Sequence, residues 1–139
     1  MLENFEGRGG FILAKALEDK KAVISVDCNS QCFKYAVLSI LHYDEIEAHR
    51  FRPAKYAKWE HELNFDGLNI DNMSFKDIEK FEKLNKIKIV VHLWKKGLEG
   101  VRYNHRASNY DRVVNLLLVY NDNNLELHYY GFSNINSIC

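Results

Sequence analysis

Cys32, one of the 3 cysteines, is the residue of this chain whose type and position point most directly to chemistry. Cys32 stands where the turn-forming residues 27–31 give way to the apolar run 33–41, so we expect it in the first turn of a helix. There the positive end of the helix dipole and the unpaired backbone N–H groups favour the thiolate, which is the nucleophilic form of cysteine. Cys32 is therefore our candidate nucleophile, and the alternative is a small buried hydrophobic residue.

A cysteine nucleophile needs a general base, usually a histidine that the fold brings close to it. Among the 6 histidines, His128 ranks first because it lies in the last predicted strand, a rigid platform for a base, and His105 ranks second. His92 alternates with apolar neighbours in a strand pattern and is expected in the core. The other histidines are expected at solvated or capping positions: His42, His49 and His61.

Turn residues beside the cysteine are candidates for the other groups that such a site needs. Asn29 is our candidate for orienting the imidazole. Other polar residues near the cysteine or the histidine remain alternatives for that role: Asp27, Ser133 and Asn134. We assign Gln31 and Ser30 to the oxyanion and substrate side of the site, together with the backbone N–H groups of this loop. Plain turn or surface chemistry is the competing interpretation for all of these residues.

The composition argues against several classes of protein and several kinds of binding site. The formal net charge is +0, whereas general nucleic-acid binders usually carry a basic excess, so we expect no nucleic-acid partner. The 3 cysteines do not suit a secreted disulfide scaffold, and a reduced, intracellular protein is predicted. Cys28 and Cys32 do not form a C-x-x-C pair and have no histidine close in sequence, so we predict no metal site and no cofactor. No apolar run is long enough for a transmembrane helix, and no membrane partner is expected.

Two helices are expected to position or support these residues. Apolar residues at helical spacing predict the first helix over residues 33–41, capped by Ser30 or Asn29. Ser74 followed by Asp77 is a capping-box pattern and predicts the second helix over residues 74–85.

The predicted strands gather late in the chain. Single strands are expected over residues 21–26, 86–94 and 101–108, and a hairpin over residues 113–132. This order predicts one α+β domain over residues 1–139, with residues 1–10 as a flexible lead-in. In that domain an antiparallel sheet carries His128 against the helix that begins at Cys32.

Three short motifs carry a resemblance that covers almost the whole chain. They are CFKY at 32–35, KDIEKFE at 76–82 and HY at 128–129, within a pattern that runs from about residue 7 to residue 138. The pattern resembles a domain of animal Maverick/Polinton-type transposons, where it precedes a protein-primed family B DNA polymerase.

The first and last motifs also resemble, more loosely, the OTU class of papain-like cysteine proteases, whose members remove ubiquitin. This resemblance implies a papain-like fold and a cysteine peptidase in which Cys32 attacks a peptide or isopeptide carbonyl and His128 is the general base. The implied partner is a protein substrate: ubiquitin, a ubiquitin-like protein or a polyprotein.

The chain departs from the OTU pattern at Tyr130, because an acidic or amide residue often stands two positions after the histidine in that class. This departure motivates a second hypothesis, a catalytically inactive papain-like fold that acts as a protein-interaction module in a transposon or virus-like replication system. A third hypothesis is a nucleic-acid-binding accessory of the polymerase, against which the neutral net charge counts.

Overall fold

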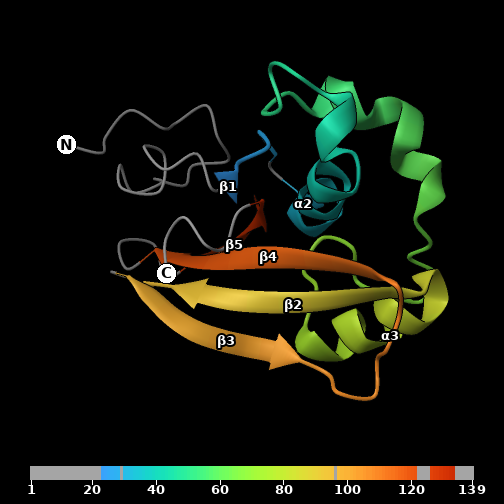
Figure 1. Cartoon of the computed structure of the whole chain (residues 1–139), viewed down its shortest axis with the longest axis vertical. Helices are drawn as coiled ribbons and strands as arrows, with labels where there is room; N and C mark the ends of the chain where they lie inside the picture. The colour runs from blue at the N-terminus through green and yellow to red at the C-terminus, as the bar shows by residue number, and fades with distance from the viewer. Residues whose placement is uncertain (1–22, 29, 96, 122–125, 134–139) are drawn as a thin grey trace.

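A computed structural model describes residues 23–28, 30–95, 97–121 and 126–133 (Figure 1). The predicted lead-in 1–10 lies outside these residues. The described elements are, in chain order, β1 (Val23–Ile24), α2 (Cys32–Leu41), η1 (Tyr43–Glu45), η2 (Pro53–Glu62), α3 (Phe75–Asn85), β2 (Ile87–Trp94), β3 (Leu98–Asn104), β4 (Arg112–Asn121) and β5 (Glu126–Phe132). The two η elements are 3₁₀ helices. No helix in the described part of the chain has the length and apolar character needed to cross a membrane.

The strands form one mixed sheet in the order β1-β5-β4-β2-β3. All neighbouring pairs are antiparallel except β2 and β4, which run parallel from Ile87 opposite Arg112 to Trp94 opposite Val119. The prediction of an antiparallel sheet is therefore wrong for this central pair, while the α+β class is confirmed. The path of the chain explains the difference. Since β3 runs back along β2 to the level where β2 began, the next strand starts there, on the other side of β2, and must run parallel to it (Figure 1).

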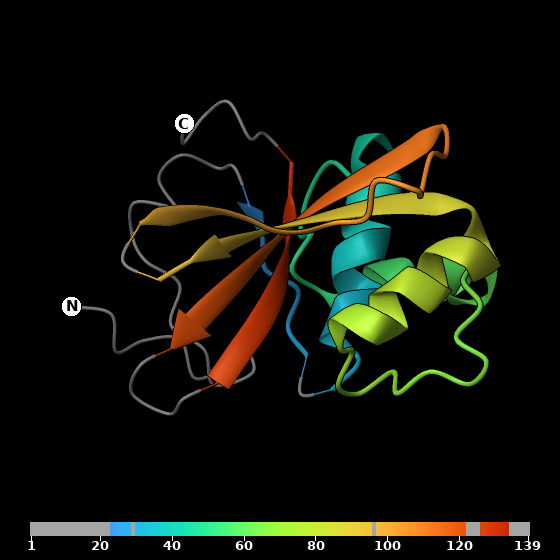
Figure 2. The same cartoon turned by 90° about the horizontal axis from the view of Figure 1, so that it is seen from below.

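Helix α2 packs on the sheet through the apolar face that the sequence predicts. Phe33, Ala36 and Val37 are buried in one cluster with residues of β2 and β4. The ring of Phe33 also meets the ring of Tyr129 in β5 edge-on, with centroids 5.3 Å apart. Figure 2 shows α2 and α3 together on one side of the twisted sheet. The helix that carries the candidate nucleophile thus rests directly on the strand that carries the candidate base.

The close approach of α2 to β5 depends on Gly131. A Cβ atom at this position would lie 2.4 Å from Ser39 Oγ and 3.0 Å from a methyl group of Ile40. Because real Cβ contacts are not that short, any other residue here would force the Ser39 and Ile40 side chains or the β5 backbone to shift. Gly131 therefore helps to set the spacing between the two elements of the candidate site.

Helix α3 begins with the predicted capping box. Ser74 Oγ accepts a hydrogen bond from the backbone N–H of Asp77 at 3.1 Å, and the Asp77 carboxylate accepts one from the backbone N–H of Ser74 at 3.2 Å. Ile78 and Phe81 then bury the apolar face of the helix in the same core as α2. This reciprocal cap explains why the boundary was readable from the sequence.

One charged residue of α3 is buried as well. Glu82 is fully buried, and its carboxylate accepts hydrogen bonds from the backbone N–H of Ile89 at 2.8 Å and from the hydroxyl groups of Tyr103 at 2.6 Å and Ser108 at 2.8 Å. These partners come from β2, from β3 and from the loop after β3. We call this set the Glu82 cluster. It joins α3 to one end of the sheet, and its only trace in the sequence is a charged residue near an apolar stripe.

Candidate functional site

The helix that presents Cys32 begins at that residue, as predicted. Gln31 occupies the N-cap position in the left-handed conformation, at φ 60°, and no side chain in the described part of the chain caps the first turn. The prediction that Ser30 caps the helix is therefore wrong, because the chain turns sharply at Gln31 and Ser30 is left exposed. Asn29, the other predicted cap, lies outside the described residues. Since none of the described side chains caps this turn, its first N–H groups can donate to a thiolate or an oxyanion.

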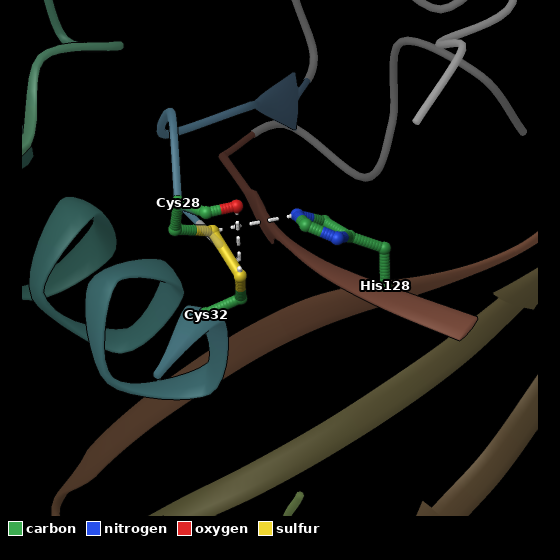
Figure 3. Close-up of a disulfide and its surroundings, with 3 residues drawn as sticks. All are labelled: Cys28, Cys32 and His128. Carbon is green, nitrogen blue, oxygen red and sulfur yellow. Dashed lines mark hydrogen bonds between the residues drawn. A yellow bond between two sulfur atoms is a disulfide. The ribbon is translucent and has the colours of Figure 1, made fainter. Parts of the chain in front are cut away.

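The structure joins Cys28 to Cys32 in a disulfide, with their Cα atoms 5.7 Å apart (Figure 3). The carbonyl oxygen of Cys28 also lies 3.6 Å from Cys32 Sγ. The expectation that both cysteines are reduced is thus not met. The reason is local: the turn through Ser30 and Gln31 folds the segment after β1 back over the start of α2. A spacing of four across predicted turn residues was the signal that could have indicated this pairing.

His128 meets this pair of cysteines from β5, opposite Val119 of β4 (Figure 3). Its Nε2 atom lies 3.5 Å from Cys28 Sγ, and one ligand atom from each of Cys28, Cys32 and His128 lies within 4.8 Å of the others. The side chain is only 8% exposed, and burial lowers the pKa of His128 from 6.5 to about 4. The imidazole is therefore neutral near pH 7 in the disulfide form. Of the histidines that the sequence offered, the structure brings His128 to Cys32.

The runner-up histidines have partners elsewhere in the fold. Nδ1 of His105 lies 3.1 Å from Ser108 Oγ, beside the Glu82 cluster. His92 is buried as predicted, with its Nε2 atom 3.3 Å from Asn115 Oδ1. The ring of His42 stacks on Trp59 at a centroid distance of 3.9 Å. The three histidine rings therefore contact other parts of the fold and not Cys32, so these histidines are not candidates for the base.

Gln31 has a partner that sequence reasoning missed. Its Oε1 atom accepts a hydrogen bond from Lys34 Nζ at 2.6 Å, and the same Nζ is paired with Glu60 of η2 at 2.9 Å. The Lys34 side chain is only 8% exposed, so the pair orients Gln31 firmly. The amide N–H groups of Gln31 remain the donors that a substrate carbonyl would use. The three-residue spacing from Gln31 to Lys34, across the first helical turn, was the available signal.

The third member of a catalytic triad is not assigned by the described residues. Asn29 and Asn134 lie outside them. Asp27, another alternative, donates its backbone N–H to Phe51 O at 2.7 Å, which fixes the segment just before Cys28. Tyr130 packs beside the imidazole, with ring centroids 5.0 Å apart. Packing by Tyr130 therefore contributes to the orientation of His128.

The same three residues form a set of donors suited to a metal ion. The sequence places no histidine near the cysteines, but β5 brings in His128 from 100 residues further along the chain. Thiolate sulfur and imidazole nitrogen are ligands typical of zinc. The fold thus supplies a third possible metal ligand, which could not be predicted because it lies far from the cysteines in the sequence.

A scan of the chain against protein-family models finds no match, and searches of curated proteins and of solved structures find none either.

Proposed function

We propose that this domain is a papain-like cysteine peptidase that cleaves a peptide or isopeptide bond, with Cys32 as nucleophile and His128 as general base. One observation carries the proposal. A cysteine in the first turn of the helix packed on the sheet meets a buried, neutral histidine from the adjacent strand, with their reactive atoms within 4.8 Å. Nucleophile and base need this kind of proximity, which tightens further when substrate binds.

In the proposed reaction, His128 Nε2 accepts the proton of the Cys32 thiol, and the thiolate attacks the substrate carbonyl carbon. The uncapped N–H groups at the start of α2 and the amide of Gln31 donate hydrogen bonds to the oxyanion. The protonated imidazole then gives its proton to the leaving amine as the C–N bond breaks. Water, activated by His128, hydrolyses the thioester and regenerates the thiol.

The disulfide defines which form of the protein carries out this reaction. A sulfur bonded to Cys28 cannot act as a thiolate, so Cys32 becomes a nucleophile only after a dithiol reduces the Cys28–Cys32 bond. The proposed setting is therefore a reducing, intracellular compartment. The resemblance to transposon and OTU domains supports ubiquitin, a ubiquitin-like protein or a polyprotein as the substrate.

The test is covalent labelling by ubiquitin that carries a C-terminal electrophile, with and without prior reduction. We expect the reduced wild type to form the adduct, Cys32→Ala to form none, and His128→Ala to react at least 10-fold more slowly. His61→Ala, which changes an exposed histidine of η2, is the matched control and should react like the wild type.

Two other results would change the assignment. If reduced protein forms no adduct and Cys32 also reacts slowly with iodoacetamide at pH 7, the peptidase proposal is wrong and the inactive interaction module is favoured. If Cys32→Ala still forms the adduct, Cys32 is not the nucleophile.

A further inference from the structure

We propose that the reduced form of the site binds one zinc ion through Cys28 Sγ, Cys32 Sγ and His128 Nε2. The inference rests partly on the proposed function, because the bound ion would occupy the nucleophile and the base and so inhibit the peptidase. The ligands come from three segments of the chain: the loop after β1, the first turn of α2, and β5 (Figure 3).

The distances between the donor atoms fit one tetrahedral ion. Zinc holds thiolate sulfur at about 2.3 Å and imidazole nitrogen at about 2.0–2.1 Å, so such ligands lie roughly 3.5 Å apart. His128 Nε2 and Cys28 Sγ are 3.5 Å apart in the structure. Two thiolates on one zinc ion lie roughly 3.7 Å apart, a separation that the two sulfurs reach by side-chain rotation once their bond is reduced.

The charges and the surroundings also favour zinc. Two thiolates and one neutral imidazole balance the two positive charges of the ion. His128 is buried, with its ring 5.0 Å from the ring of Tyr130, whereas Cys32 is partly exposed. The exposed side gives the ion a path of entry and leaves a fourth position for water. Calcium and magnesium prefer oxygen ligands and do not suit this donor set.

Cys28 is the residue that distinguishes this site from a plain cysteine–histidine pair. It has no role in the proposed peptidase chemistry, yet its sulfur lies 3.5 Å from His128 Nε2. With Cys28 the ion has three protein ligands, and without it only two. In the disulfide form neither sulfur is a thiolate, so oxidised protein offers only the imidazole and should not hold the ion.

Cobalt(II) spectroscopy tests the site without requiring any enzyme activity. Reduced, chelator-treated protein is titrated with Co²⁺ in the absence of oxygen, and the thiolate-to-cobalt charge-transfer and visible d–d bands are recorded. We expect bands that saturate at one equivalent and disappear on addition of one equivalent of Zn²⁺. Cys28→Ser and His128→Ala should each weaken binding at least 10-fold, and His61→Ala should bind like the wild type.

The disulfide form of the wild type is the internal control and should give no bands. The proposal is overturned if reduced wild type gives no saturating bands, or if Cys28→Ser binds as tightly as the wild type. These results do not depend on the ubiquitin probe, so a failed peptidase proposal leaves the cobalt result intact. Where the probe does react, Zn²⁺ should block the labelling of the wild type at lower concentrations than that of Cys28→Ser.

Discussion

Two groups of polar residues lie toward opposite ends of β4, and they differ in the kinds of contact that hold them. At the end where Val114 pairs with Ile89, the Glu82 carboxylate accepts three hydrogen bonds of 2.6–2.8 Å. At the end where Val119 pairs with His128, the contacts are longer: 3.5 Å from Nε2 to Cys28 Sγ and 3.6 Å from Cys32 Sγ to Cys28 O. Both groups gather residues that are far apart in the sequence.

The difference supports a structural role for one end and is compatible with the chemical role proposed for the other. Three short hydrogen bonds fix the Glu82 carboxylate and leave it little capacity for reaction, so it stabilises the fold. A disulfide joins the two sulfurs, and burial lowers the pKa of the neighbouring His128 imidazole. Reduction of that bond would place two thiols beside a neutral imidazole, the set of groups on which both proposals rest.

The largest effect that separates the two ends is expected from Cys32→Ala. This change should lower the rate of adduct formation by at least 10³-fold, because the reacting sulfur is gone, while the reduced protein should unfold at the same urea concentration as reduced wild type. Labelling and urea unfolding, both under reducing conditions, check the two halves of this prediction. A large loss of stability in the variant would mean that this end of the molecule is structural too.

Glu82→Ala should produce the opposite pattern. Three donors would lose their buried acceptor, and we expect the free energy of unfolding to fall by about 3 kcal/mol. Labelling by the ubiquitin probe, measured at a temperature where the variant is folded, should not change. Glu79→Ala is the matched control from the same helix and should cost less than about 0.5 kcal/mol because Glu79 is partly exposed. Equal costs for the two variants would contradict the structural role of Glu82.

The pH dependence of stability should carry a signature of His128. The pKa of His128 is about 4 in the folded protein and 6.5 in the unfolded chain. Between these values the unfolded chain binds more protons, so the free energy of unfolding falls as the pH decreases from 6.5 to 4. This contribution is present in full above pH 6.5 and amounts to about 3 kcal/mol over the interval.

Urea unfolding of the disulfide form at several pH values measures this contribution. Wild type should lose about 3 kcal/mol more than His128→Ala between pH 6.5 and pH 4. If the two proteins show the same slope, His128 is not buried in its neutral form, and the candidate base is exposed to solvent.

Elements defined by nearby residues were predictable from the sequence, and contacts between distant elements were not. The periodic apolar residues from Phe33 onward placed the start of α2 at Cys32, and Ser74 with Asp77 placed the start of α3. In each case the signal lies within a few residues of the feature it predicts. His128 could also be predicted from the sequence, because few histidines lie on a late strand.

The remaining features depend on the path of the chain through space. The parallel pairing of β2 with β4 follows from the route of β3, and apolar alternation along a strand is the same for either direction of pairing. The burial of Glu82 requires hydrogen-bond donors from β2, β3 and the loop after β3. No pattern in the sequence around Glu82 predicts these donors. The approach of His128 to Cys28 likewise needs the whole sheet to be in place.

The Cys28–Cys32 disulfide itself is expected to have a smaller effect on stability than Glu82 or His128. The bond closes a very short loop, so loop-closure entropy predicts that its reduction lowers the free energy of unfolding by only about 2 kcal/mol. Its effect on chemistry should be much larger, because wild type should form the ubiquitin adduct only after reduction, whereas Cys28→Ser should form it without reductant. Urea unfolding and probe labelling of both proteins, each with and without dithiothreitol, measure the two effects side by side. If oxidised wild type reacts as fast as reduced wild type, the disulfide does not control Cys32, and the contrast between a stabilising end and a reactive end of β4 would rest on His128 alone.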